Sequence, residues 1–413
     1  MKSLSKRGLS MPSSPIRKLA PYADKAKEKG RHIYHLNIGQ PDIHTPDSFM
    51  QPIKNLDMPV LAYGPSGGFL SLRKKLTEYY ARYDINLNHE DILVTTGGSE
   101  AIIFAFMAIA DPGDEIIIPE PFYTNYNGFA VEAGVNIVPI TSSIEDDFQL
   151  PPIARIADQI TDKTRAILIC NPNNPTGYVY SEEELEALRK IVLEHNIFLL
   201  ADEVYREFTY DNLQHKSILT LSEIEDRTIM LDSVSKRYSA CGARIGMIAS
   251  RNEEVISAAL KFGMARLCPP SIEQIGVEAG IDTPKAYFDE VLDEYRERRN
   301  VMVGKLREMP GVVAPMPKGA FYLVVKLPVD DADAFTQWLL TDFHIDNETV
   351  MIAPANGFYF SAGLGKNEVR IAYVLRIEDI KKAMHILSEA LKVYPGRSEP
   401  VSQAQASQHM AKH

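Results

Sequence analysis

The amino-acid sequence predicts an α/β protein in which a mainly parallel sheet lies between helices and is joined to a smaller α+β domain. Two observations support this. Through the middle of the chain, short continuously apolar runs alternate with helical patterns, as in parallel strands covered on both faces. After about residue 280 one long charged amphipathic helix is followed by shorter elements. Strand–helix alternation implies a parallel sheet, and the later change of pattern implies a second domain.

The predicted elements follow in chain order. For the large sheet we expect a strand at 92–96, a helix over 101–110, and further strands at 115–119, 165–170, 197–201, 228–232 and 245–249. For the smaller domain we expect a helix over 286–307, strands at 312–315, 321–326 and 369–372, and helices over 332–340 and 377–391. The residues up to 47 show no sheet of their own, so we expect them to pack on the small domain or on a partner subunit.

These elements divide the chain. The expected bounds are 48–280 for a large domain, 1–47 (with an N-terminal arm) and 281–394 for a small domain, and 395–413 for a disordered tail. The tail is polar and has no hydrophobic periodicity, so it cannot bury enough apolar surface to fold.

Composition narrows the functional classes. A chain of 413 residues can bury a core without disulfides or a structural metal. Its net charge of −11 argues against nucleic acid or an anionic membrane as the main partner. The three cysteines lack zinc or disulfide spacing, so we expect no metal and reduced thiols in a cytoplasmic protein. No apolar run is long enough to span a membrane.

A lysine follows an apolar strand in SVSKRYSACGAR, residues 233–244. Lys236 at a strand end, held out of bulk water, is suited to attack a carbonyl group. Ser233, Ser235 and Arg244 together offer a phosphate site, with the guanidinium as a bidentate donor. A carbonyl compound that carries a phosphate describes pyridoxal phosphate. Most lysines are solvated surface groups, and this run alone leaves that role open.

A glycine-rich turn in TTGGSEAI, residues 95–102, precedes a helix. Backbone N–H groups and the dipole at a helix N-terminus favour a phosphate. Gly97 and Gly98 let the backbone approach closely, and Ser99 adds a hydroxyl. The turn matches neither nucleotide-binding loop pattern, and such turns are more often plain connections.

A carboxylate ends the apolar run IFLLAD. Open α/β sheets bind ligands at the carboxyl ends of their strands, and a buried Asp202 needs a cationic partner such as a protonated pyridine nitrogen. Tyr205 lies three residues on. The alternative is that Asp202 caps a following helix.

A fourth strand end leads into NPNNPTG, residues 171–177. Asn174 is a candidate to hydrogen-bond a ring hydroxyl or a substrate carboxylate, although these Asn side chains also satisfy turn backbones. Four strand ends that each fit one part of the same cofactor supply a nucleophile, a charge partner, an anion site and orienting hydrogen bonds.

At this point the chain resembles the class I and II aminotransferases of fold type I, the aspartate aminotransferase superfamily. The resemblance covers about residues 37–380. Its motifs are LNIGQPD (36–42), YGPSGG (63–68), NPTG (174–177), DEVY (202–205), SVSK followed by Arg (233–244), PKGAFY (317–322) and VRIAY (369–373). The resemblance implies a large domain with a mainly parallel seven-stranded sheet that binds pyridoxal 5'-phosphate.

The resemblance also implies roles for individual residues. Lys236 matches the lysine that binds the cofactor as a Schiff base and moves the proton. Asp202 matches the partner of the pyridine nitrogen. Tyr205 and Asn174 match the residues that donate hydrogen bonds to the ring oxygen. The aromatic residue stacked on the ring corresponds to Tyr123. The phosphate cup corresponds to Ser233, Ser235 and Arg244, with Gly98 and Ser99.

The resemblance also implies roles for three residues in binding the substrate and the partner subunit. Tyr63 matches a tyrosine that reaches the phosphate of the neighbouring subunit, which implies a homodimer with shared active sites. Arg370 matches the arginine that binds the substrate α-carboxylate, assisted by Gly39 and Asn174. From the residues alone, pairing with a nearby acid is the more common role for Arg370, and ordinary packing is the more common role for Tyr63 and Tyr123.

The resemblance is weakest for the substrate side chain. The arginine that binds a distal carboxylate in aspartate enzymes corresponds to Gly263, and the lysine used by some bacterial relatives corresponds to Met107. Arg266 and Arg17 are the remaining candidates. We expect transamination between L-aspartate and 2-oxoglutarate, with aromatic or broad specificity as the alternative.

Three other functions stay open. A lyase or decarboxylase on the same fold would use the same lysine and differ only in its products. A non-enzymatic regulator would need a DNA-binding domain ahead of the fold, and only about 35 residues stand there. A nucleotide-binding protein would need loop patterns that the chain lacks.

Overall fold

The computed structural model describes residues 4–398 and divides the chain into two compact units. Unit 1 comprises residues 4–12, Gln40–Asp293 and Lys318–Ala320. Unit 2 comprises Ser13–Gly39, Glu294–Pro317 and residues 321–398. The expected domain bounds remain a prediction, and most of the expected tail, residues 399–413, lies outside the described residues.

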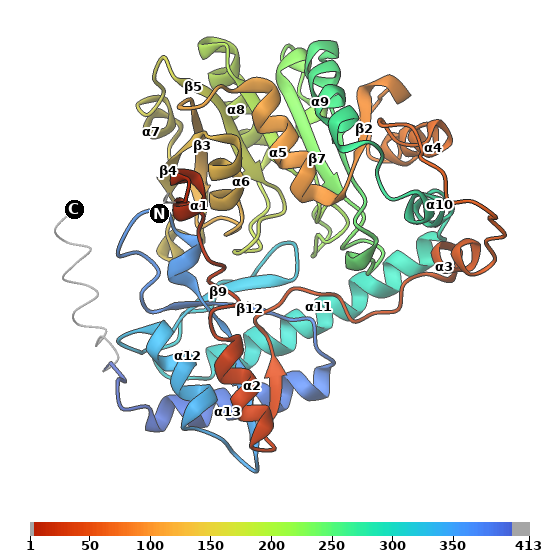
Figure 1. Ribbon diagram of the computed structural model, residues 1–413. Coiled ribbons are helices and arrows are strands. Elements are labelled where there is room, and N and C mark those ends of the chain that lie inside the picture. Colours follow the sequence, from red (N-terminus) through yellow and green to blue (C-terminus); the bar gives the residue numbers. More distant parts are fainter. Residues whose placement is uncertain (1–3, 399–413) are drawn as a thin grey trace. The chain divides into compact units, whose positions relative to one another are not determined.

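Unit 1 contains a seven-stranded sheet (Figure 1). Its order across the sheet is β2 (Ile92–Thr95), β8 (Gly246–Ala249), β7 (Thr228–Ser233), β6 (Phe198–Asp202), β5 (Thr164–Cys170), β3 (Glu115–Glu120) and β4 (Asn136–Thr141). Strand β8 runs antiparallel to both neighbours, and the other pairs are parallel. The predicted fold class, with a mainly parallel sheet, is confirmed.

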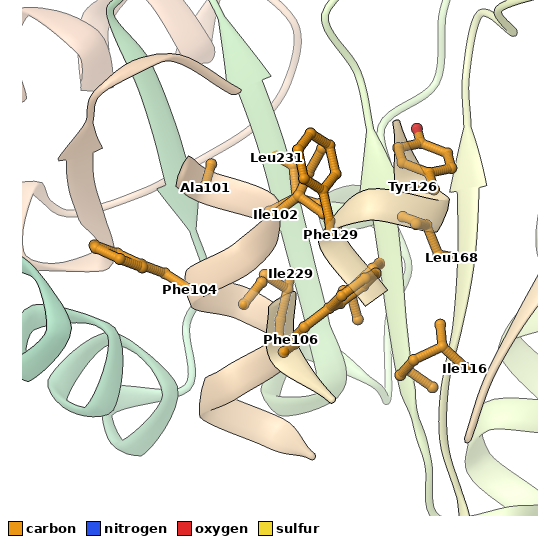
Figure 2. Close-up of a cluster of buried hydrophobic side chains, with 14 of the residues drawn as sticks. Ala101, Ile102, Phe104, Phe106, Ile116, Tyr126, Phe129, Leu168, Ile229 and Leu231 are labelled. Carbon is orange, nitrogen blue, oxygen red and sulfur yellow. The ribbon is translucent and has the colours of Figure 1, made fainter. Parts of the chain in front are cut away.

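Both faces of this sheet are covered, which explains why its strands are continuously apolar. Successive side chains of a strand point to opposite faces. Leu168, Leu200 and Leu231 pack in one core cluster, and Ile169 and Ala201 pack in another. Figure 2 shows the first cluster, in which side chains of helices α5 (Gly97–Ile109) and α6 (Tyr126–Ala133) meet those of the strands.

The helices of unit 1 divide between these faces. Helices α5, α6 and α9 (Glu253–Arg266) contribute to the first cluster. The opposite face is covered by α3 (Asp47–Lys54), α4 (Leu70–Ala81), α10 (Ser271–Gly280), α7 (Ile153–Ala157) and α8 (Glu182–His195). A short helix α1 (Lys6–Ser10) also belongs to unit 1.

Helix α8 shows how the sequence sets a helix. The Ser181 hydroxyl accepts a hydrogen bond from the Glu184 amide at 3.2 Å, and the Glu184 carboxylate accepts one from the Ser181 amide at 2.7 Å. This capping box satisfies two N–H groups that the first turn leaves unbonded. The helix ends at Asn196, whose left-handed φ of 53° stops it.

Unit 2 contains two small sheets. Strand β1 (His32–His35) pairs in parallel with β10 (Glu348–Met351). Strand β12 (Glu368–Ala372) lies between β11 (Ala353–Pro354) and β9 (Tyr322–Lys326). Its helices are α2 (Ala20–Glu28), α12 (Ala332–Thr341) and α13 (Ile377–Val393), and the long α11 (Lys285–Arg307) passes from unit 1 to unit 2 at Glu294.

Two sequence predictions in this part were wrong. Residues 312–315 form no strand, because the backbone there makes only a single bridge, between Val313 and Lys326. Residues 13–39 pack on the small domain, as expected, but they also contribute a strand to it, β1, whose four residues HIYH were too short and too polar to stand out. The 3₁₀ helices are η1 (His89–Asp91), η2 (Ile144–Asp146), η3 (Ile218–Thr220), η4 (Glu225–Arg227), η5 (Cys241–Ala243) and η6 (Ala355–Phe358).

Within residues 4–398, no helix is both long and apolar enough to cross a bilayer.

Candidate active site

The candidate residues of unit 1 gather at one edge of the sheet. Strands β5, β6 and β7 are parallel neighbours, with Cys170 opposite Asp202 and Asp202 opposite Leu231. Their carboxyl ends therefore lie together, as ligand-binding edges of open α/β sheets do. The turns that leave them carry Asn174, Tyr205 and Lys236.

Asp202 is a buried carboxylate on the face covered by α6. The Tyr126 hydroxyl donates a hydrogen bond to its Oδ2 at 2.9 Å, and the Val204 amide lies 3.4 Å from Oδ1. Burial raises the pKa of Asp202 to about 6, and these two hydrogen bonds act in the opposite direction. Residues 203–207 form a turn rather than a helix, so Asp202 caps no helix. A buried carboxylate of this kind is suited to a cationic ligand group.

The turn after β5 uses two of its Asn side chains internally. Asn173 Oδ1 accepts from the amide and the hydroxyl of Thr176 at 3.1 and 3.0 Å. Asn171 Oδ1 accepts from the Tyr180 amide at 3.2 Å. The purely structural role therefore applies to Asn171 and Asn173. Asn174 lies in the same turn and is also buried.

A second feature of the site is a polar cup at the N-terminus of α5. Ser233 and Ser235 hydroxyls lie 2.9 Å apart, and a Cβ on Gly98 would lie 3.5 Å from the Ser233 Cβ. Arg244 is exposed, with a guanidinium hydrogen bond to the Cys241 carbonyl. The predicted phosphate residues Gly98, Ser233, Ser235 and Arg244 are thus brought together, with Ser99 in the same first turn of α5.

The glycines of this cup fit an anion that must approach the backbone. Gly97 has φ of 77°, and a Cβ there would lie 2.2 Å from an Arg244 nitrogen. A Cβ on Gly246 would lie 2.4 Å from the Gly97 carbonyl carbon. Side chains are therefore excluded where helix N–H groups, two hydroxyls and a guanidinium converge, which is the donor set of a phosphate site.

Lys236 lies in the turn between β7 and β8. Its Nζ is 3.7 Å from Cys241 Sγ, and its carbonyl accepts from the Ser239 amide at 3.2 Å. The side chain is half-buried, and it follows Ser235 of the cup directly. The nucleophile and the anion site therefore belong to the same turn.

The four tyrosines of the candidate site differ in their distance from Asp202 and in their exposure. Tyr123 meets Tyr126 edge-on, with ring centroids 5.6 Å apart, so the predicted stacking residue is one ring away from Asp202. Tyr205 is buried. Tyr63, in contrast, is 82% exposed.

In unit 2, Tyr322 contacts both Arg370 and Gly39. The Arg370 guanidinium donates to the Asn37 carbonyl at 2.6 Å and lies between the rings of Tyr322 and Phe358, at 4.6 and 4.8 Å from their centroids. The Tyr322 hydroxyl lies 3.4 Å from the Gly39 carbonyl. A Cβ on Gly39 would overlap that hydroxyl at 1.7 Å, which explains why glycine stands there. The planar arginine is held rigidly by two aromatic faces.

The two arginines that are candidates to bind a distal substrate carboxylate, Arg266 and Arg17, lie in different surroundings. Arg266 Nε lies 3.2 Å from both Glu100 oxygens, and its other nitrogens reach the carbonyls of Val94 and Ser66 at 3.3 and 3.5 Å. It ties α9 to α5 and to the loop before α4, and its charge is already matched by Glu100. Arg17 is exposed in unit 2.

Sequence reasoning missed Tyr126. The signal was present, because Tyr126 stands three residues after Tyr123 in the same PEPFYTNY run. Nothing in that spacing predicts that its hydroxyl reaches the end of β6, which follows 76 residues later.

The fold and the site residues define a class of enzyme. The chain belongs to the family of class I and II aminotransferases, whose sequence profile matches residues 31–387. The chain is therefore an aminotransferase.

Its relatives include several aspartate enzymes. The aspartate aminotransferase of Bacillus subtilis is 33% identical over 92% of this chain and 97% of its own length. A solved structure of the Thermus thermophilus aspartate aminotransferase, a single mutant, has a TM-score of 0.86 and 28% identity over 95% of this chain and 100% of its own. The alanine aminotransferase of Pyrococcus furiosus has the same TM-score, 0.86, with 32% identity over 94% of this chain and 100% of its own.

Proposed function

We propose that this enzyme transfers the amino group of an L-amino acid to a 2-oxo acid with pyridoxal 5'-phosphate, and that L-aspartate and 2-oxoglutarate are its preferred pair. One observation carries the proposal: Lys236, the Ser233–Ser235–Arg244 cup and the buried Asp202 lie at neighbouring strand ends. A nucleophile, an anion site and a carboxylate for a cationic ring are the parts that this cofactor needs.

Each proposed role follows from the chemistry of the residue. The cup, with Gly98 and Ser99, holds the phosphate by helix N–H groups and Arg244. Asp202 holds the pyridine nitrogen in its protonated form, Tyr123 covers the ring, and Tyr205 and Asn174 donate to the ring oxygen. When bound, the cofactor supplies an electron sink for the charge left after the substrate loses its α-proton.

Lys236 carries out two tasks in this proposal. Its Nζ would hold the cofactor through the cofactor's carbonyl group, with release of water, until the substrate amine takes its place. The released Nζ would then be free to accept the proton from the substrate Cα and to donate it again. A second substrate, a 2-oxo acid, reverses these steps, so the kinetics should be of the ping-pong type.

The aspartate preference is supported by relatives with that printed name. An aromatic or broad preference is the second candidate, because one relative, from Thermococcus litoralis and 30% identical, is named aromatic-amino-acid aminotransferase 2. Competing amino donors should be assayed with 2-oxoglutarate. A higher kcat/KM for phenylalanine than for aspartate would overturn the preference, and carbon dioxide or an eliminated group in place of an oxo acid would indicate a decarboxylase or lyase.

Arg370→Lys should raise the KM for amino and oxo acids by about 10–100-fold, because lysine cannot form the two parallel hydrogen bonds of a guanidinium to a carboxylate. Losing one charge-assisted hydrogen bond is worth about 1.5–3 kcal/mol. Steady-state kinetics measures this. A primary amine without a carboxylate is the control substrate and should react equally slowly with both proteins. An unchanged KM would remove Arg370 from the substrate site.

In the cofactor-free protein, Tyr126→Phe should move the titration of the Asp202 carboxyl group to higher pH, which NMR of the labelled aspartate side chains measures. The pKa of Asp202 is already raised to about 6, and the Tyr126 hydrogen bond opposes that rise. Removing the bond raises the pKa further, so the carboxylate is lost at a higher pH as the solution is acidified.

Tyr34→Phe is the matched control for this measurement. Tyr34 donates to Glu348 at 2.9 Å, the same length as the bond from Tyr126 to Asp202, but within unit 2. If both variants shift the titration of Asp202 equally, or neither does, the Tyr126 hydroxyl does not set the pKa of Asp202.

A homodimer is part of the proposal. Met58, Val60, Leu61 and Tyr63 form an exposed apolar segment ahead of α4, and exposed apolar groups of this kind favour a protein partner. We expect a second copy to cover it and Tyr63 to reach the partner's phosphate. Sedimentation equilibrium showing a monomer would contradict this.

The free thiols of Cys170, Cys241 and Cys268 support a reducing cytoplasmic location, which cell fractionation tests.

A further inference from the structure

Five charged side chains form a buried cluster next to the candidate site. This ion network consists of Glu203, Arg206, Glu207, Asp232 and Arg237, all buried in unit 1. Each of four members is the chain neighbour of a site residue: Glu203 follows Asp202, Arg206 follows Tyr205, Asp232 precedes Ser233, and Arg237 follows Lys236.

Strand alternation places the network and the site on opposite faces of the sheet. Asp202 contacts Tyr126 of α6, and Ser233 lies next to Gly98 of α5. Their neighbours point the other way. Asp232 accepts from Tyr80 of α4 at 2.8 Å, and Glu203 accepts from the Ile218 amide of η3 at 3.0 Å.

Asp232 is the centre of the network. Both of its oxygens are used: Oδ1 by Arg237, and Oδ2 by Arg206 at 3.2 Å in addition to Tyr80. Burial alone would raise the pKa of Asp232, but Arg237 and Arg206 outweigh it and hold that pKa below its usual value. The carboxylate is therefore charged, and the contact with Arg237 is an ion pair.

This ion pair closes the turn that carries Lys236. Asp232 Oδ1 also accepts from the Ser233 amide at 2.7 Å, at the start of the turn. Arg237, one residue after Lys236, lies 3.5 Å from the Ser233 carbonyl and 3.5 Å from Glu207 Oε1. Its guanidinium is covered by the Tyr79 ring, 4.5 Å from the centroid. One carboxylate and one guanidinium thus fix both ends of the segment that displays Ser233, Ser235 and Lys236.

We propose that Arg237, held by Asp232 and Glu207, is a positioning residue that fixes Lys236 for attack on the cofactor carbonyl. The inference rests on the proposed function. The physical reason is that a nucleophile on a turn keeps its geometry only when the turn is braced, and small displacements of a reacting group slow a reaction strongly. Buried ion pairs contribute little net stability, so orientation is their better-supported use here.

Arg237→Lys tests this, because it keeps the charge and loses the fork that spans two carboxylates. Pyridoxal phosphate is added to cofactor-free protein, and the growth of the visible absorption band reports the rate at which Lys236 attacks the aldehyde. That rate should fall about tenfold. In turnover, kcat should fall by a similar factor, while the KM for the amino acid stays within about twofold.

Arg189→Lys is the control. Arg189 lies on helix α8, away from the site, and it also bridges two carboxylates, those of Glu186 and Glu223. We expect its rate of band growth to equal that of the unmodified protein. Equal rates for Arg237→Lys and Arg189→Lys would overturn the proposal. If the unmodified protein forms no band, the proposed function fails instead.

A second variant covers the case in which Arg237→Lys does not fold. Tyr80→Phe removes one hydrogen bond to Asp232 and keeps every charge of the network. It should slow band growth by a smaller factor, about twofold to threefold. An unchanged rate in a folded Tyr80→Phe protein would also overturn the proposal.

Discussion

Lys236→Ala should lower the rate of transamination by at least about 10⁴-fold, because both the nucleophile and the proton carrier are lost. The variant should still bind pyridoxal phosphate, since the cup of Ser233, Ser235 and Arg244 is unchanged. Borohydride reduction followed by peptide mass spectrometry measures the covalent link directly. The peptide with Lys236 should gain the mass of the cofactor in the unmodified protein only.

Lys190→Ala is a suitable control, because Lys190 is an exposed residue of helix α8. It should keep full activity and the same labelled peptide. Labelling of a different lysine, or residual activity of Lys236→Ala above about one hundredth of the original, would exclude Lys236 as the covalent residue.

Asp202→Asn should have two opposite effects. Activity should fall by about 10²–10⁴-fold, because a neutral amide cannot hold the ring nitrogen in its protonated form. The cofactor-free protein should become more stable at neutral pH. Burial raises the pKa of Asp202 from 3.8 to about 6, so keeping this carboxylate ionised destabilises the folded state.

The sign of the stability effect follows from proton binding. A group whose pKa is raised in the folded state stabilises it fully only below the unfolded value, and that contribution is lost as pH rises through the folded value. At pH 8 the whole difference of about two units, roughly 3 kcal/mol, opposes folding. Denaturant unfolding of the cofactor-free protein should show a gain for Asp202→Asn that is larger at pH 8 than at pH 5. A loss of stability at pH 8 would contradict a raised pKa.

Six of the seven strands of the large sheet could be predicted because burial on both faces leaves a continuous apolar run, as in β5 and β6. The edge strand β4 was missed, because it is only partly buried. Strand β1 could not, because it has only four residues and two of them are histidines, which flank the buried pair Ile33 and Tyr34. The expected strand at 312–315 failed for a related reason: short apolar stretches also occur where a single bridge forms.

Candidate site residues could be proposed from the sequence where they stand at the end of an apolar run, as Asp202 does, or in the turn that follows one, as Lys236 does. The ion network was not, since Glu203 and Arg237 look like ordinary solvated charges in the sequence. Only the fold shows that Arg237 pairs with Asp232 of β7, which Tyr80 of α4 also contacts, and that Glu203 pairs with Arg206. In the same way, the contact between Arg266 and Glu100 joins segments 166 residues apart, so no local sequence pattern predicts it.

The most direct test of the central claim is the near-ultraviolet and visible absorption spectrum of the purified protein, before and after addition of single amino acids. A visible band that disappears with L-aspartate or L-glutamate is the expected result, since it requires both the cofactor on Lys236 and transfer of the amino group. Disappearance only with aromatic or neutral amino acids would keep the enzyme class and overturn the aspartate preference. A folded protein without any band after incubation with pyridoxal phosphate would contradict the role assigned to Lys236.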